Sequence, residues 1–146
     1  MTNIRLGVKE DIEAIRAHQH EHSHVSDDLL KQCIQNGWVY VAENDGDIIG
    51  YARLEFIWLE IPYLALITLE DEYQGQGIGT EMIQRISNDL ARQGRTSLYT
   101  SSEVMEPRPQ SFHRKCGFKE CGIIAGMNPK GIGEIFFVKK LDQSSE

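Results

Sequence analysis

The sequence predicts a mixed α/β fold, of the α+β type, built on a partly antiparallel sheet. Two apolar runs flank the turn Asp45-Gly46, a dipeptide that supplies the positive-φ positions of a tight hairpin. Residues 78–90 carry apolar side chains at helical spacing, directly after a glycine-rich segment that follows a strand pattern. Hairpin strands together with a strand–helix unit indicate a sheet of mixed pairing.

The other elements follow from the same periodicities and from their boundary residues. Ser26 precedes two aspartates and an apolar run, the pattern of a capped helix, and Gly94 ends the helix after the glycine segment. Trp38 and Trp58 fall in strand patterns, so we expect both in the core or on the sheet face. The expected order is a strand at 3–8, helices at 9–20 and 26–36, strands at 38–44, 47–58 and 63–70, a helix from 78 to Gly94, a strand at 96–101, a helix at 107–116, and strands at 118–125 and 134–141.

Length and composition are those of one globular domain. The chain has 146 residues, of which 40% are hydrophobic and 25% charged. No stretch approaches the roughly 20 apolar residues of a membrane span, and the first residues contain no apolar leader pattern. We therefore expect a single domain over residues 1–146, in the cytoplasm and without a membrane partner.

The charge balance bears on the class of partner. Twenty-two acidic against 15 basic residues give a net charge of −7. A surface of this sign repels the phosphate backbone of nucleic acid, which usually binds to a basic patch. We expect no nucleic-acid partner, and the acidic surface favours cationic small molecules or basic peptides.

The cysteine pattern fits neither a disulfide framework nor a zinc site. Cys33, Cys116 and Cys121 are odd in number and show no CxxC spacing. We expect all three to be reduced and to serve in packing.

The segment QGQGIGTEM, residues 74–82, predicts an anion-binding turn. A glycine-rich turn between strand and helix presents backbone N–H groups at the positive end of the helix dipole. It is not a Walker loop, because Ile78-Gly79-Thr80 follows where that loop requires lysine. It is not the usual dinucleotide loop, because its third glycine comes one residue early and in mid-chain. A glycine turn without a ligand remains the alternative.

Two motifs carry a resemblance to a known family. The run ITLEDEYQGQGIGTEMIQRI resembles the acyl-CoA-binding motif of the GNAT superfamily of N-acetyltransferases, with Gln74, Gly77 and Gly79 at its Gln/Arg-x-x-Gly-x-Gly/Ala positions. The run SFHRKCGFKECG is similar to that family's helix that ends in a Gly-Phe step, here Gly117 and Phe118. The resemblance covers nearly the whole chain and implies the GNAT fold, a mixed, mostly antiparallel sheet of six or seven strands with about four helices.

The resemblance implies acetyl-CoA as cosubstrate. Its pantetheine arm would lie along the backbone edge that includes Ile67 and Leu69, and a main-chain N–H near Leu69 would polarise the thioester carbonyl. His113 would also contact coenzyme A. The pyrophosphate would lie on the loop residues Gln74, Gly75, Gln76, Gly77, Ile78, Gly79 and Thr80.

Catalytic positions depart from the family pattern. Many members carry a glutamate base where this chain has Tyr63, so Glu60 or Glu55 is the alternative candidate to relay a proton through water. The usual tyrosine proton donor is replaced by His113, an imidazole that titrates near neutrality. Glu106 stands where an asparagine often contacts the cofactor. The predicted catalytic residues are His113, Glu60 and Tyr63.

The run HQHEHSH places His18, His20, His22 and His24 at alternate positions. Pairs four residues apart on a helix could hold a metal ion, but the run falls between two expected helices and lacks an HExxH pattern. We expect no metal there. In the family this connection walls the acceptor pocket, so substrate contact and an ordinary solvated loop are the open alternatives.

The predicted function is transfer of an acetyl group from acetyl-CoA to a primary amine, directly and in a ternary complex. The acceptor is a small-molecule amine or a peptide amine. The alternatives are a non-catalytic acyl-CoA-binding or sensing module and, among enzymes, a protein N-terminal acetyltransferase. Ile135, Phe136 and Phe137 are expected to be exposed and would allow a homodimer.

Overall fold

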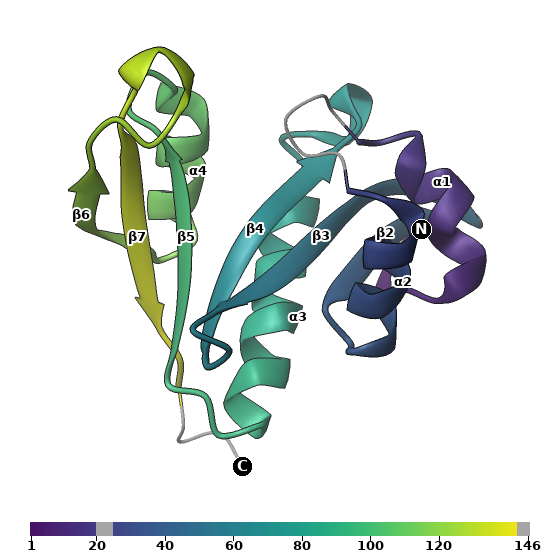
Figure 1. The fold of residues 1–146 in the computed structure, drawn as a ribbon. Helices are drawn as coiled ribbons and strands as arrows, with labels where there is room; N and C mark the ends of the chain where they lie inside the picture. The colour runs from purple at the N-terminus through teal and green to yellow at the C-terminus, as the bar shows by residue number, and fades with distance from the viewer. Residues whose placement is uncertain (20–24, 143–146) are drawn as a thin grey trace. The chain divides into compact units, whose positions relative to one another are not determined.

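The structure, a computed structural model, describes residues 1–19 and 25–142. Within these residues it contains seven strands and four α-helices, as the sequence predicts (Figure 1). The strands are β1 (Thr2–Leu6), β2 (Val39–Asn44), β3 (Asp47–Ile57), β4 (Ile61–Leu69), β5 (Ser97–Glu103), β6 (Lys119–Ile124) and β7 (Glu134–Lys140). The helices are α1 (Ile12–Arg16), α2 (Asp27–Gln35), α3 (Ile78–Arg92) and α4 (Pro107–Lys115), with short 3-10 turns η1 (Lys9–Asp11), η2 (Asp71–Tyr73) and η3 (Pro129–Gly131).

The sheet is mixed and mostly antiparallel. Its strand order is β1-β2-β3-β4-β5-β7-β6. β4 and β5 pair in parallel, at Tyr63 with Tyr99 and Leu64 with Thr100. The pairs β1–β2, β2–β3, β5–β7 and β6–β7 are antiparallel. The predicted fold class is therefore confirmed.

The chain forms two compact units. One contains Met1–Glu55 and Ala65–Ile86, and the other contains Phe56–Leu64 and Ser87–Glu146. Both β4 and α3 contribute residues to each unit. Whether residues 1–146 behave as one domain stays a prediction.

The first unit has an apolar core between its helices and strands. Ser26 caps α2 as predicted, since its side chain accepts a hydrogen bond from the Leu29 N–H at 3.2 Å. Figure 1 shows α1 and α2 beside β2 and β3. The core cluster consists of Ile12, Ile15, Leu30, Val39, Val41 and Tyr51.

The turns on either side of β3 place non-glycine residues in the left-handed region. In the β2–β3 turn, Asp45 has φ 52° and Gly46 has φ 89°, which confirms the predicted hairpin. In the β3–β4 turn, Trp58 has φ 55° and Leu59 has φ 62°. Trp58 is 83% exposed, so its predicted place in the core or on the sheet is wrong. Trp38 is half-buried at the entry to β2.

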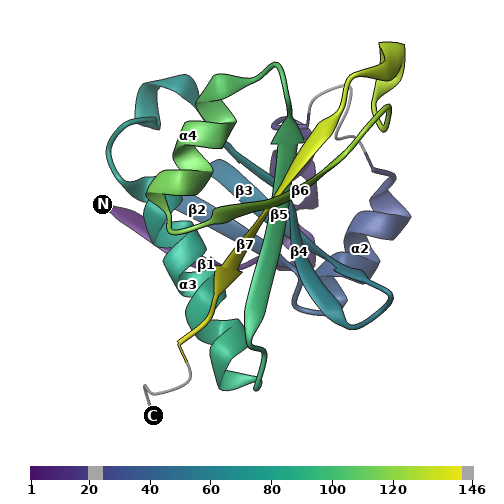
Figure 2. The same cartoon turned by 90° about the vertical axis from the view of Figure 1, so that its left-hand side faces the viewer.

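In the second unit, α4 packs along one face of β5, β7 and β6 (Figures 1 and 2). Burial alternates along β5, with Leu98, Thr100 and Ser102 buried and the residues between them half-buried. Because side chains alternate along a strand, this pattern means that one face of β5 lies in the core under α4. Phe137 points to that core and is fully buried, and Ile135 and Phe136 are half-buried, so the prediction that these three side chains are exposed is wrong.

Other expectations fail at particular positions. The helix predicted from 9 to 20 divides into η1 and the shorter α1, which ends at Arg16. Cys116 is buried and Cys33 half-buried, whereas Cys121 is exposed on β6 and does not pack in the core. Across the described residues, every helix is too short or too polar to cross a bilayer.

Candidate functional site

The predicted loop forms a turn between η2 and α3 in which two glycines have positive φ. Gly75 has φ 77° and Gly77 has φ 86°, conformations that side chains rarely adopt. A Cβ placed on either glycine would meet no atom within 4 Å. The glycines are therefore required by backbone angle, and the space beside them is open to an approaching group.

The backbone amides of the loop stand at the head of a long helix. The Glu81 N–H donates to the Gly77 carbonyl at 3.0 Å, which begins the helical ladder. The N–H groups of Ile78 and Gly79 precede that first bond, and those are the groups that a helix leaves without intrahelical acceptors. α3 runs for 15 residues from this point, so its dipole favours an anion here.

Two glutamine side chains tie the loop to the segment before it. Gln74 Nε2 donates to the Leu69 carbonyl at 2.9 Å, and Gln76 Nε2 donates to the Glu72 carbonyl at 3.0 Å. The first bond ties the loop to the end of β4, and the second ties it to η2. The glutamine of the motif therefore has a local structural role in this chain.

His18 pairs with Glu70 rather than with another described histidine. Its Nε2 lies 2.8 Å from Glu70 Oε2, and its Nδ1 lies 2.9 Å from the Ala14 carbonyl. The predicted i, i+4 pairs need His20, His22 and His24, which lie outside the described residues. Within residues 1–19 and 25–142, no three His, Cys, Asp or Glu side chains are grouped to hold a metal ion.

A polar network joins three strands of the second unit. Tyr63 Oη lies 2.5 Å from Ser101 Oγ, and Ser101 Oγ donates to Glu134 Oε2 at 2.5 Å. Asn128 Nδ2 donates to the other carboxylate oxygen, Oε1, at 2.8 Å. The Tyr63 ring also lies 6.1 Å from that of Phe136, centroid to centroid. Of the predicted catalytic residues, Tyr63 alone belongs to this network.

His113 lies on the other side of the same strands, in the core under α4. It is 4% exposed, and the rings of Phe112, Phe118 and Phe137 surround it at 5.4 to 5.9 Å between centroids. Burial lowers the His113 pKa to about 4, against smaller opposing effects of a hydrogen bond to the Ser101 backbone and of the Glu134 charge. At neutral pH the ring is therefore uncharged. Its predicted role as proton donor stays a prediction.

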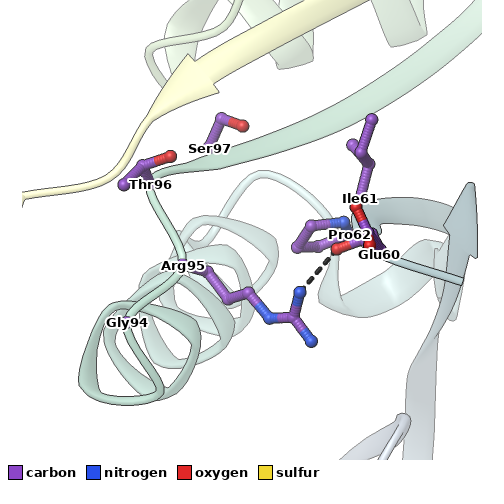
Figure 3. Close-up of a pocket in the computed structure, with 7 residues that line it drawn as sticks. All are labelled: Glu60, Ile61, Pro62, Gly94, Arg95, Thr96 and Ser97. Atoms are coloured by element: carbon purple, nitrogen blue, oxygen red, sulfur yellow. Dashed lines mark hydrogen bonds between the residues drawn. The ribbon is translucent and has the colours of Figure 1, made fainter.

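Glu60 borders a pocket at the start of β4 (Figure 3). Its backbone carbonyl accepts a hydrogen bond from the Arg95 guanidinium at 2.5 Å, and that guanidinium lies 5.0 Å from the Phe56 ring centroid. The pocket has a volume of about 400 Å³. Its lining residues are Glu60, Ile61, Pro62, Gly94, Arg95, Thr96 and Ser97. None of the predicted cofactor-binding residues is among them.

The two other predicted carboxylates have ordinary surroundings. Glu55 is exposed and forms an ion pair with Arg53, whose side chain is 8% exposed. Glu106 is exposed at the N-cap of α4, where its side chain makes no capping bond. Neither belongs to the polar network.

A family model described as an acetyltransferase (GNAT) domain matches residues 35–120, more than half of the chain. The chain belongs to the GNAT family of acetyltransferases. The match includes the glycine loop, the four strands β2 to β5 and the Gly-Phe step. A comparison with curated protein sequences finds no match.

Solved GNAT structures share the fold at low sequence identity. A GNAT-family acetyltransferase from Bacillus cereus is 19% identical over 97% of this chain and 99% of its own, with a TM-score of 0.80. A ribosomal-protein-alanine N-acetyltransferase from Brucella melitensis is 21% identical over 95% and 99%, also with a TM-score of 0.80. A Bacillus anthracis protein assigned as a streptothricin acetyltransferase, solved with acetyl coenzyme A, is 20% identical over 71% and 62%, with a TM-score of 0.66.

Sequence reasoning missed Ser101, Asn128 and Glu134. The alternation of TSLYTS does put Ser101 and Tyr99 on one face of a strand, a signal that could have marked the serine. No local pattern points to Glu134, because its contacts come from strands distant in the sequence.

Proposed function

We propose that this GNAT-family protein transfers an acetyl group from acetyl-CoA to a primary amine, directly and in a ternary complex. The observation that carries the proposal is the loop, in which two positive-φ glycines open onto the amides that begin α3. Such amides favour a pyrophosphate, and the open space beside each glycine lets it approach the backbone.

The loop residues Gln74 to Thr80 would hold the coenzyme A pyrophosphate. Ile67 and Leu69, on β4, would present backbone groups to its pantetheine arm, and the N–H near Leu69 would polarise the thioester carbonyl. When bound, acetyl-CoA supplies an activated acyl group with a thiolate leaving group. The protein must then orient the amine and remove its extra proton, because only a neutral amine has the lone pair that attacks.

The acceptor class follows from charge and from the relatives. A net charge of −7 favours a cationic amine over an anionic partner. One structural relative is a ribosomal-protein-alanine N-acetyltransferase, which makes a peptide α-amine a reasonable probe beside small amines. A cytoplasmic location, a homodimer and the lack of a nucleic-acid partner stay predictions.

The second candidate is a non-catalytic acyl-CoA-binding module. It is favoured by Tyr63 and His113, which stand where the resemblance places a carboxylate base and a phenol. Such a module would bind acetyl-CoA through the same loop without turning it over.

Two measurements separate the candidates. Calorimetric titration of acetyl-CoA tests the loop, and we expect micromolar binding that Gly77→Glu abolishes. Release of free coenzyme A thiol is then followed with spermidine, with a peptide bearing a free N-terminal alanine, and with an N-blocked peptide bearing one lysine. Faster release with an amine supports the enzyme, whereas binding without release across these amines supports the module. Absence of binding would contradict both.

A further inference from the structure

Three strands of the second unit bring two hydroxyls and a carboxylate into one hydrogen-bonded chain. The β4–β5 register aligns Tyr63 with Tyr99, and the β5–β7 register aligns Ser101 with Phe136. Because side chains alternate along a strand, Ser101, Phe136 and Glu134 share the face opposite α4. The Tyr63 hydroxyl reaches Ser101 on that face, and Ser101 reaches Glu134, each at 2.5 Å between oxygens.

The direction of these hydrogen bonds is fixed by their chemistry. A carboxylate carries no proton, so the single Ser101 hydroxyl hydrogen is donated to Glu134. The Tyr63–Ser101 bond must then use the Tyr63 hydrogen, with Ser101 Oγ as acceptor. Protons along this line point from Tyr63 toward Glu134. A phenolic oxygen can also accept a hydrogen bond, so an ammonium donor can join the line at Tyr63.

Glu134 is held in place at both oxygens. Asn128 donates to Oε1 at 2.8 Å while Ser101 donates to Oε2. Its cross-strand partner on β5 is a second carboxylate, Glu103. Across the sheet its charge also acts on the buried, neutral His113. The carboxylate is half-buried, and the hydrogen bonds to both of its oxygens fix its position.

The geometry points to Glu134 as the final acceptor of the proton that the amine must lose, reached through Tyr63 and Ser101. The ammonium proton passes to Tyr63 Oη, the Tyr63 proton passes to Ser101 Oγ, and the Ser101 proton passes to Glu134 Oε2. The step ends with a neutral amine, an unchanged phenol and hydroxyl, and a protonated Glu134, so charge and protons balance. Tyr63 is the catalytic residue, and Ser101 and Glu134 act through it.

This inference rests on the proposed function and deepens it. It explains how a chain with tyrosine at position 63, where the resemblance places a glutamate, still has a carboxylate at that site. The carboxylate comes from β7 instead of β4, two hydroxyls away.

The test uses Tyr63→Phe, Ser101→Ala and Glu134→Gln in the full chain, with Glu103→Gln as a control that removes a neighbouring negative charge. Tyr63→Phe keeps the ring against Phe136 and removes only the hydroxyl. We expect each relay variant to lose about 100-fold in kcat/KM at pH 7, the lower range for general acid–base catalysis. Affinity for acetyl-CoA should stay within about twofold of wild type, as should the turnover of Glu103→Gln.

The diagnostic measurement is how the loss of activity in each variant depends on the protonation state of the amine. With Tyr63→Phe, Ser101→Ala and Glu134→Gln, the deficit should shrink as pH approaches the amine pKa, near 8 for a peptide α-amine and about 10.4 for lysine. At pH 8 the deficit should therefore be smaller with the alanine peptide than with the lysine peptide. A merely structural role would lower both activities equally at every pH, and that result would overturn the relay.

The other outcomes are also decisive. Variants that turn over as fast as wild type would refute the relay and leave the acetyltransferase function standing. A wild type that binds acetyl-CoA but acetylates none of the amine probes would refute the proposed function, and the relay with it. Thermal melts identify a variant that fails to fold, and Tyr63→Phe then carries the test.

Discussion

The glycine loop at residues 74–80 and the Tyr63–Ser101–Glu134 network differ in how the chain builds them. The loop uses backbone amides, set by the φ angles of neighbouring residues and the start of one helix. The network uses side chains from three strands. Tyr63 and Ser101 are 38 residues apart in the sequence, and Ser101 and Glu134 are 33 apart, yet the oxygens of each pair lie 2.5 Å from each other. Local geometry therefore encodes the proposed cofactor contact, whereas strand pairing encodes the proposed proton path.

The largest expected effect comes from a substitution in the glycine loop. Gly77→Glu forces a side chain into a φ of 86° and sets a carboxylate beside the proposed pyrophosphate. We expect acetyl-CoA affinity to fall at least about 1,000-fold, about 4 kcal/mol by calorimetry. Gly37→Glu is the matched control, because Gly37 also has a positive φ, 76°, and open space beside it. Equal loss of affinity in both variants would mean that strain, and not a bound anion, explains the result.

The next largest effect is the pH dependence of stability that arises from His113, in the core under α4. The His113 pKa of about 4 lies below its ordinary value of 6.5, so the unfolded chain binds more protons between these values. The neutral ring stabilises the fold fully above about pH 6.5, and this stability is lost as pH falls toward 4, by about 3 kcal/mol.

Denaturant unfolding at pH 7 and pH 4.5 checks the His113 prediction. The loss between the two pH values should be smaller in His113→Phe than in wild type. An identical loss would contradict the burial argument. The same variant tests the predicted donor role separately, because a donor would also show a lower kcat with unchanged acetyl-CoA affinity.

A double substitution tests whether Ser101 and Glu134 of the network act together. If Ser101 and Glu134 act in one proton path, either change alone should remove most of its benefit. We expect Ser101→Ala/Glu134→Gln to lose about 100-fold in kcat/KM at pH 7, about 2.7 kcal/mol, no more than either single variant. Multiplied losses, near 10,000-fold, would show two independent contributions and would exclude a shared path.

The smallest expected effect concerns backbone strain in the β3–β4 turn, where no ligand is proposed to bind. Leu59 has a φ of 62° and is 89% exposed, so its side chain adds strain without burial. We expect Leu59→Gly to raise the free energy of unfolding by about 1 kcal/mol, since glycine removes a left-handed penalty of 1–2 kcal/mol at a small entropic cost. Leu54→Gly, at a buried strand position, should instead destabilise strongly. A destabilised Leu59→Gly protein would mean that the exposed leucine makes a contact worth more than its strain.

Sequence reasoning succeeded where a short segment determines its own conformation. Ser26 caps α2, and Asp45-Gly46 closes a hairpin, because each depends on bonds among immediate neighbours. It failed at Trp58 and Phe137. Strand periodicity does not show that β3 ends at Ile57 or which face of β7 lies under α4.

The sequence by itself determined the order of elements, the mixed sheet and the glycine loop, since hydrophobic periodicity and backbone φ preferences are properties of adjacent residues. Tertiary structure alone decided that Ser101 contacts both Tyr63 and Glu134 and that His113 is buried beneath the same strands. Those facts depend on the register in which distant strands pair. A one-residue shift of that register would turn each of these side chains to the opposite face of the sheet.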